Sequence, residues 1–257
     1  MIWIDNLDPV ALDLGFVQIR WYGIFYAIAF LLGFAWLKFC ARKGLIRFSA
    51  KQIEDLIFGL ILGVIVGGRL GNFIFYDPAN LFSLTVFKIW QGGMSFHGGL
   101  LGVLFVIFWF AQKWNKSFFE IADAIVIPAA IGLFFGRLGN FVNGELVGRP
   151  TGANWGMIFP NFDETPRYPS QLFEAAKSLG MAGLLLLILQ TKPRTGVLSF
   201  AFLTFYGVGR TAIEIFWREP IDGFLFGLPK GAAYSLPIFC LGILGLIWLT
   251  FRRERRA

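Results

Sequence analysis

The sequence is poor in the residues that most often hold metals or form disulfides. It has one histidine, His97, and two cysteines among 257 residues. A single histidine excludes a multi-histidine metal centre. Cys40 and Cys240 lie in separate apolar runs, so they provide neither a disulfide framework nor a Cys-x-x-Cys site. We therefore expect no metal ion.

Charged residues are also scarce. They make up 15% of the chain, against 56% hydrophobic residues, and the mean hydropathy is +0.66. These values are typical of a membrane protein with several spans. The net charge of +7 comes from basic residues at the ends of apolar runs and not from one soluble face, which argues against nucleic-acid binding.

Seven apolar segments have roughly the 20 residues that a bilayer core requires. They predict an all-α protein with seven transmembrane helices, forming a single integral membrane domain over residues 1–257. The expected spans are 21–39, 54–75, 96–114, 120–143, 171–190, 196–217 and 235–251.

Lysine and arginine are unevenly divided between the two sets of loops, which predicts the orientation. The richer set includes the short connection 191–195 and the C-terminal tail. We therefore expect the N-terminus outside and the C-terminus in the cytoplasm. The outer segments 76–95, 144–170 and 218–234 are long, and loops of that length often carry function. The basic residues expected inside are Arg42, Lys43, Arg47, Lys51, Lys113, Lys116, Lys192, Arg194, Arg252, Arg253, Arg255 and Arg256.

Three arginines lie inside apolar runs. Arg69 and Arg137 occur in a repeated Gly-Arg-Leu-Gly-Asn-Phe segment, and Arg210 lies in a third run. At 1.5 Å per residue, all three lie about 21–25 Å from the inner end of their spans. An arginine at such depth is costly unless it faces a cavity, a partner or a charged ligand. The simplest ligand for three arginines is a phosphate.

Helical spacing gives these spans a polar face. Tyr206, Arg210 and Glu214 recur at intervals of four residues, and Asn140 follows Arg137 by three. Arg210 and Glu214 could instead form a structural ion pair, and Arg69 could reach the membrane surface. Spacings such as Gly59-x-x-x-Gly63 favour close helix packing.

His97 lies between two pairs of glycines, Gly92-Gly93 and Gly98-Gly99. Four glycines permit a bent backbone with room for a ligand. Although a lone histidine is often structural, this setting favours a functional role.

Several segments together resemble the prolipoprotein diacylglyceryl transferase family. They are Gly92–Gly99, Gly136–Glu145 and Arg167–Glu174, with Trp21-Tyr22-Gly23 and the stretch from Tyr206 through Arg210 to Glu214. The match covers nearly the whole chain in order.

The resemblance implies an enzyme of the bacterial inner membrane, without metal or organic cofactor. It would transfer the diacylglyceryl group of phosphatidylglycerol to the lipobox cysteine of a preprolipoprotein signal peptide, releasing glycerol 1-phosphate. The loop at 144–170 would then be periplasmic. By position, the resemblance marks as functional Tyr22, His97, Arg137, Asn140, Glu145, Gly148, Tyr206 and Arg210.

This chemistry needs a thiolate and a stabilised phosphate. We expect Arg137 and Arg210 to bind the phosphate, because guanidinium groups match its geometry. His97 is the candidate base for the thiol. Further expected contacts to the lipid, or to the arginines that bind it, are Tyr22, Asn140, Asn143, Glu145, Gly148, Tyr206, Glu214 and Arg69.

Two other classes share some of these features. A transporter for an anionic solute would also bury arginines, although its charges would lie nearer the midplane. An enzyme acting on a lipid headgroup with another acceptor is the second alternative, and only the resemblance favours a thiol acceptor over a hydroxyl.

Overall fold

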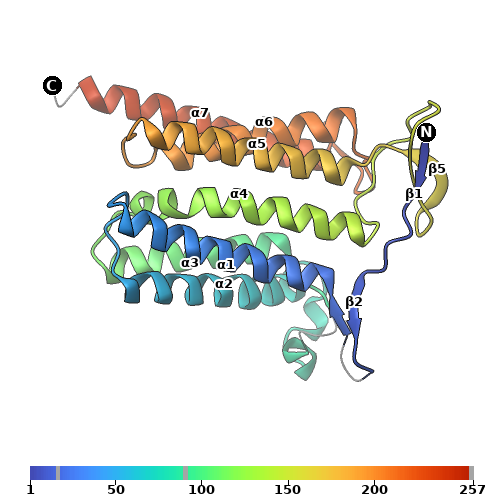
Figure 1. Cartoon of the computed structure of the whole chain (residues 1–257), viewed down its shortest axis with the longest axis horizontal. Helices are drawn as coiled ribbons and strands as arrows, with labels where there is room; N and C mark the ends of the chain where they lie inside the picture. Colours follow the sequence, from blue (N-terminus) through green and yellow to red (C-terminus); the bar gives the residue numbers. More distant parts are fainter. Residues whose placement is uncertain (16–17, 89–91, 255–257) are drawn as a thin grey trace. The chain divides into compact units, whose positions relative to one another are not determined.

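The computed structural model describes residues 1–15, 18–88 and 92–254, with 252–254 described by backbone alone. Arg255 and Arg256, two of the basic residues expected inside, lie outside the described residues. The described chain contains seven long helices joined by short strands and turns (Figure 1). Six of these helices are long and apolar enough to cross a membrane, so this is a multi-pass membrane protein. The count of seven spans and the direction of the termini stay predictions.

Each predicted span corresponds to one helix. The helices are α1 (Trp21–Arg42), α2 (Ala50–Tyr76), α3 (Phe96–Lys113), α4 (Phe118–Val142), α5 (Ser170–Gln190), α6 (Val197–Phe216) and α7 (Lys230–Glu254). The expected last span, 235–251, lies within α7, which begins five residues earlier. Hydrophobicity marks the part of a helix suited to lipid, whereas backbone hydrogen bonding continues into the more polar residues from Lys230.

Among the described residues, α6 is the long helix that is not apolar enough to count as a candidate span. It carries Arg210 and Glu214, whose charges lower its hydropathy. Both side chains are ion-paired inside the protein, as described below.

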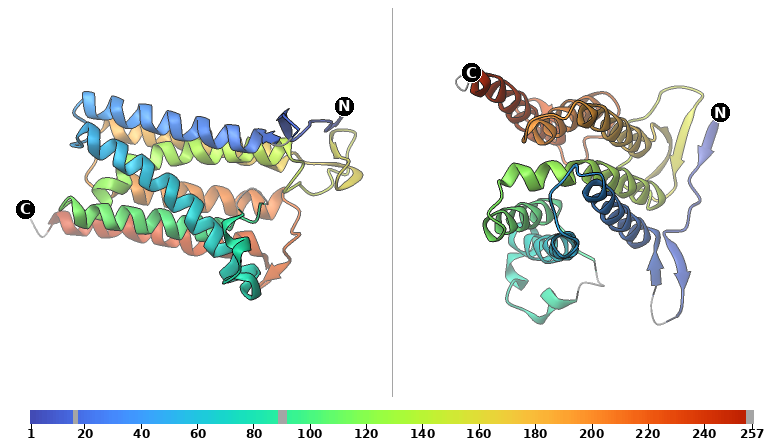
Figure 2. Two further views of the ribbon diagram at one scale, coloured as in Figure 1. Left: turned by 90° about the horizontal axis from the view of Figure 1, so that it is seen from below. Right: turned by 60° about the vertical axis from the view of Figure 1, so that its left-hand side comes forward.

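Short strands precede α1 and occupy the segments between α4 and α5 and between α6 and α7. A three-stranded sheet has the order β1 (Ile2–Ile4), β4 (Gly156–Phe159), β5 (Asp163–Arg167), with β1 parallel to β4 and β5 antiparallel to it. The right-hand view of Figure 2 shows the blue N-terminal strand beside the yellow segment that contains β4 and β5. Two further hairpins pair β2 (Val10–Asp13) with β3 (Gln18–Arg20), and β6 (Phe224–Leu225) with β7 (Leu228–Pro229). The 3₁₀ turns η1 (Pro78–Asn80) and η2 (Leu84–Phe87) follow α2.

The chain forms two compact units, which we describe separately. The first contains residues 1–31 and 126–257, and the second contains 32–125. In the first unit α6 packs against both α5 and α7. Gly207 of α6 lies so close to α7 that an added Cβ would be 2.6 Å from the backbone nitrogen of Phe239.

In the second unit, α2 and α3 pack through facing glycines. A Cβ on Gly67 would lie 2.4 Å from the carbonyl oxygen of Gly98, and one on Gly63 would lie 2.9 Å from that of Gly102. Only glycines permit this approach of two backbones. The packing role predicted for the Gly-x-x-x-Gly spacings is therefore confirmed.

Side-chain caps fix where these two helices begin. Ser49 accepts a hydrogen bond from the backbone of Gln52, and the Gln52 side chain accepts one from Ser49, which completes a capping box before α2. The Ser95 hydroxyl accepts from the backbone of Gly98 at 3.3 Å and caps α3. The caps set the positions of Arg69 near the end of α2 and His97 in the first turn of α3.

Candidate active site

A buried carboxylate on α5, Glu174, is the centre of a charged cluster in the first unit. Its side chain is 1% exposed. Its Oε1 accepts a hydrogen bond from Nη1 of Arg210 at 2.6 Å, and its Oε2 lies 2.9 Å from Nζ of Lys177 and 3.6 Å from Nε of Arg137. Thus three cations from α4, α5 and α6 converge on one carboxylate.

The cluster continues along α6 through a second carboxylate. Nη2 of Arg210 lies 2.6 Å from Oε1 of Glu214, and the same oxygen lies 3.4 Å from Nε of Arg218. The predicted polar stripe on α6 is therefore confirmed for Arg210 and Glu214. Glu214 also packs tightly on α7, where a Cβ on Gly231 would come within 2.6 Å of both its carboxylate oxygens.

Arg137 is linked to a second group of polar side chains at the end of α4. Its Nη1 donates to Oδ1 of Asn140 at 3.1 Å, as their spacing predicted. Nδ2 of Asn140 donates to Glu145 at 3.0 Å, and Asn143 donates to the other Glu145 oxygen at 3.1 Å. Gln171 holds this turn to α5 by donating to the Glu145 carbonyl at 2.6 Å. The amide of Asn140 therefore orients Arg137 and is itself oriented by Glu145.

Both predicted tyrosines lie in this unit. Tyr206 is one turn before Arg210 on α6, and Nζ of Lys177 lies 4.7 Å from the centre of its ring, within cation–π range. The Tyr22 ring packs on the α4 backbone, since a Cβ on Gly139 would be 2.4 Å from it. The glycine in the repeated motif thus makes room for an aromatic ring.

Gly148 lies where three segments cross. An added Cβ would be 2.3 Å from the carbonyl oxygen of Tyr168 and 2.8 Å from that of Trp217. The backbone N–H of Gly148 donates to Tyr168 at 3.1 Å, and its carbonyl accepts from Arg167 at 2.9 Å. Gly148 was predicted to contact the substrate. The geometry gives it a packing role that positions the residues after α6.

Arg167 fixes the loop that carries β4 and β5. Besides Gly148, it pairs with Glu219 at 2.8 Å and with Asp163 at 2.5 Å. The hydrogen bonds from Arg167 lower the pKa of the Asp163 carboxyl below its ordinary value. The same contacts with Asp163 raise the pKa of the Arg167 guanidinium. The predicted periplasmic loop is thus tied to the chain after α6.

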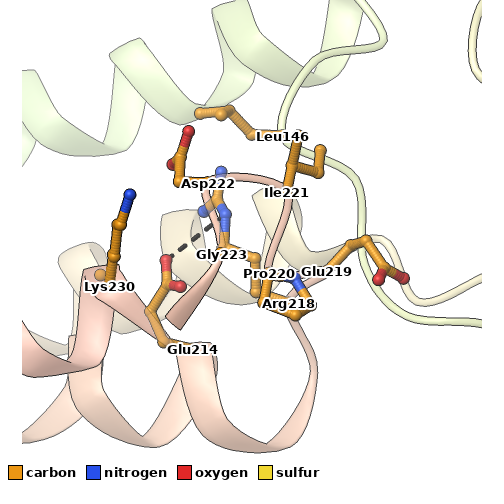
Figure 3. Close-up of a pocket in the computed structure, with 10 residues that line it drawn as sticks. Leu146, Glu214, Arg218, Glu219, Pro220, Ile221, Asp222, Gly223 and Lys230 are labelled. Carbon is orange, nitrogen blue, oxygen red and sulfur yellow. Dashed lines mark ion pairs between the residues drawn. The ribbon is translucent and has the colours of Figure 1, made fainter. Parts of the chain in front are cut away.

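A cavity of about 70 Å³ adjoins the end of α6 (Figure 3). Arg218 points into it from beside Glu214. The side chain of Arg218 is 5% exposed, and burial together with the charges of Arg210 and Arg137 lowers its pKa to about 9. Its two terminal nitrogens have no hydrogen-bond partner among the described residues.

Arg69 belongs to the second unit and holds a loop. Its guanidinium donates to five backbone carbonyls between residues 85 and 93, among them Thr85 at 2.5 Å, Val86 at 3.0 Å and Lys88 at 3.1 Å. An arginine has five N–H donors, and each is used here. The prediction that Arg69 contacts a lipid phosphate is untested, and this geometry indicates a structural role for it.

His97 also belongs to the second unit, in the first turn of α3. The glycines around it differ from one another. Gly92 and Gly93 have φ of +79° and +74° and bend the backbone, as expected, whereas Gly98 and Gly99 are helical. Gly98 serves contact with α2, so the expectation that all four glycines make room for a ligand was wrong.

Three residues of the cluster were not predicted, namely Glu174, Lys177 and Arg218. Glu174 and Lys177 are charges three residues apart near the start of an apolar run, which is a signal of a polar helix face. Arg218 was assigned to an outer loop. Its position four residues after Glu214 continues the stripe on α6.

Cations outnumber carboxylates in this cluster. The contacts above join four cations, and even with Glu145 counted there are only three carboxylates. An excess of positive charge stabilises an anion, and arginine forks are suited to phosphate. Within the part of the chain that the structure describes, no group of three histidine, cysteine or acidic side chains could hold a metal. The cations are Arg137, Lys177, Arg210 and Arg218.

Comparison with known proteins shows the family. The sequence profile described as prolipoprotein diacylglyceryl transferase matches residues 9–248. Three proteins named phosphatidylglycerol–prolipoprotein diacylglyceryl transferase are similar along their whole length. The protein of Polynucleobacter asymbioticus is 45% identical, covering 95% of this chain and 96% of that protein. The protein of Bordetella avium is 45% identical, covering 100% of this chain and 99% of that protein. The protein of Coxiella burnetii is 41% identical, covering 99% of this chain and 100% of that protein. With a profile match and full-length relatives of this identity, the chain belongs to the prolipoprotein diacylglyceryl transferase family.

Proposed function

We propose that this protein transfers the sn-1,2-diacylglyceryl group of phosphatidylglycerol to the thiol of the lipobox cysteine in a preprolipoprotein. The convergence of Arg137 and Arg210 on Glu174 carries the proposal. Two arginines from different helices, with side chains only 14% and 15% exposed and held in a cluster with excess positive charge, suit a phosphodiester lipid. The names of the relatives supply the substrates.

The reaction replaces a carbon–oxygen bond by a carbon–sulfur bond. The cysteine thiol loses its proton, and the sulfur attacks the carbon of the diacylated glycerol that is bonded to the phosphate oxygen. The carbon–oxygen bond breaks, and its electron pair leaves on the phosphate oxygen as glycerol 1-phosphate. The leaving phosphate gains negative charge, so groups that stabilise it lower the barrier.

Arg137 and Arg210 bind this phosphate and stabilise its developing charge. Glu174 is a positioning residue, because it holds both guanidinium groups from one side and leaves their other N–H groups for the lipid. Asn140 and Glu145 fix the orientation of Arg137.

The remaining predicted residues have supporting roles in the proposal. Tyr22, Tyr206 and Asn143 hydrogen-bond the glycerol or the phosphate, and Glu214 orients Arg210. Gly148 and Arg69 act on the substrate only through the segments that they hold in place.

His97 is the proposed base that takes the proton of the thiol. A free thiol has a pKa of about 8.5 and is mostly protonated at neutral pH. His97→Gln should lower the rate and flatten its pH profile. An unchanged profile with most activity retained would assign thiol activation to the field of the arginines.

The chain lies in the bacterial inner membrane as one integral domain. All seven helices cross it, with the N-terminus outside and the C-terminus in the cytoplasm. The ion pairs of Arg210 and Glu214 support a spanning position for α6, because pairing reduces the cost of charge in lipid. The segment 144–170 lies on the periplasmic side.

A mass-shift assay tests the function. Purified protein is mixed with phosphatidylglycerol and a lipobox peptide that carries one cysteine. We expect the peptide to gain a diacylglyceryl mass on its cysteine while glycerol phosphate is released. Arg137→Ala should lower the rate by roughly 10²–10³, whereas Arg20→Ala, an exposed arginine of β3, should not change it. A folded wild-type protein that binds the lipid but leaves the peptide unmodified would contradict the proposal.

A further inference from the structure

The charged cluster ends in a guanidinium whose hydrogen-bonding capacity is not used. Nε of Arg218 pairs with Glu214 at 3.4 Å. Its Nη1 and Nη2 are buried and make no hydrogen bond with any residue that the structure describes. A buried charged donor without an acceptor is costly, so native proteins rarely retain one without a ligand or an unseen partner.

The cavity at Arg218 has the size of a small anion and not of a lipid tail. It measures about 70 Å³ and is lined by the turn that follows α6 and by the start of α7. Figure 3 shows the guanidinium directed between Glu214 and the side chain of Asp222. Lys230, the first residue of α7, supplies a second cation to the lining.

Three carboxylates also line the cavity, and two of them are already paired. Glu214 pairs with Arg210, and Glu219 pairs with Arg167 at 2.8 Å. Asp222 forms no ion pair or hydrogen bond with any described residue. It lies in a turn closed by Gly223, whose φ is +85° and whose N–H donates to the Pro220 carbonyl at 2.9 Å. An anion bound at Arg218 would therefore compete with Asp222 and with the Glu214 oxygen that already pairs with Nε of Arg218.

We propose that this cavity is a second anion site, which binds the phosphate monoester group of glycerol 1-phosphate after it leaves Arg137 and Arg210. The inference rests on the proposed function for the identity of this ligand. The anion would accept hydrogen bonds from Nη1 and Nη2 of Arg218, the two donors that lack acceptors. Lys230 would add a point charge.

The position of Arg218 suits a route for the product. It lies just beyond the end of α6 and next to Arg210, since Oε1 of Glu214 lies 2.6 Å from Nη2 of Arg210 and 3.4 Å from Nε of Arg218. A phosphate monoester carries more charge than the phosphodiester from which it forms, and it needs cations along its path out of an apolar site. Arg218 offers the next cation after the reaction centre.

Binding of sn-glycerol 1-phosphate to detergent-solubilised full-length protein, measured by calorimetry, tests the proposal. The Arg137→Ala variant weakens binding at the site of Arg137 and Arg210, so that binding at the Arg218 cavity can be measured. In that background, Arg218→Gln should weaken binding about tenfold or more, since two charge-assisted hydrogen bonds are lost. Arg20→Gln in the same background should bind as its parent.

Asp222→Asn provides a second test that does not depend on removing a buried arginine. It removes the competing negative charge, so it should tighten binding of glycerol 1-phosphate. If Asp222 were only the structural partner of Arg218, this variant would bind the ligand no better and would be less stable. That result would overturn the proposal.

Further measurements distinguish a soluble phosphate monoester from a lipid one, and the second anion site from the proposed function. Phosphatidic acid in nanodiscs presents the same monoester on a lipid, and binding of this lipid without binding of glycerol 1-phosphate would overturn the product assignment. Equal affinities of the Arg137→Ala protein with and without Arg218→Gln would overturn the site itself. The peptide mass-shift assay on wild-type protein tests the proposed function independently. The proposed function and the second anion site can therefore each be refuted without the other.

Discussion

Replacement of Glu174 by glutamine tests how the charged cluster is held together. The substitution keeps the shape of the side chain but removes the charge that three cations share. One amide oxygen can still accept from Arg210, whereas the amide N–H₂ group faces another donor. We expect the variant to lose stability because Arg137, Lys177 and Arg210 would repel one another.

The magnitude follows from the contacts. Glu174 accepts short hydrogen bonds from Arg210 at 2.6 Å and Lys177 at 2.9 Å. Hydrogen bonds to charged groups contribute about 1.5–3 kcal/mol each, which gives roughly 3–6 kcal/mol for the two. Breaking a buried ion pair costs a similar 3–5 kcal/mol. Because folded proteins are stable by only about 5–15 kcal/mol, the expected loss is large.

Thermal unfolding in detergent measures this effect, alongside transfer activity. Glu174→Gln should unfold at a clearly lower temperature and lose activity. Glu164→Gln, an exposed carboxylate in β5, should change neither. A double variant that also carries Lys177→Met should regain part of the stability, because one unpaired cation is then removed. Wild-type stability of Glu174→Gln would refute the shared-carboxylate account.

Three further predictions concern the loops and the second unit. Gly98→Ala should lower the unfolding temperature, because its Cβ would lie 2.2 Å from a backbone oxygen of α2. Gly180→Ala should not, because the space around its Cβ is open. Equal effects of the two substitutions would contradict the packing account. The pKa of Asp163 is lowered in the folded protein, so its ionised carboxylate stabilises the fold above the unfolded pKa of about 3.9. This stabilisation is lost as the pH falls through the folded pKa. Acid unfolding of Asp163→Asn should therefore show a weaker pH dependence than wild type, and identical curves would show that its pair with Arg167 contributes nothing. Arg69→Met should speed protease cleavage between residues 77 and 95, because five carbonyls lose their donor; unchanged cleavage would contradict the structural role.

The positions of the helices could be predicted from the sequence because long apolar runs mark them locally. The same reasoning predicted contacts within one helix, such as Arg210 with Glu214 and Arg137 with Asn140. Contacts between helices could not be predicted in this way. Glu174 is distant in sequence from both arginines, and one chain gives no signal of which helices are neighbours.

The strands and tight crossings were missed for a similar reason. β1 pairs with β4 across more than 150 residues, and each strand is too short for a periodic pattern. The role of Gly148 depends on two carbonyls, one before α5 and one after α6, that approach its Cα. Arg218 was assigned to the outer segment 218–234, and the fold buries it beside Glu214.

Affinity for a phosphatidylglycerol analogue tests the central claim most directly, that Arg137 and Arg210 together hold the lipid phosphate. The analogue carries a methylene group in place of the bridging oxygen that would break, so it can bind without reacting. Arg137→Gln and Arg210→Gln should each weaken binding about tenfold or more. The double variant should lose less than the product of the two effects, because both groups bind one phosphate. Wild-type affinity in both single variants would contradict the claim.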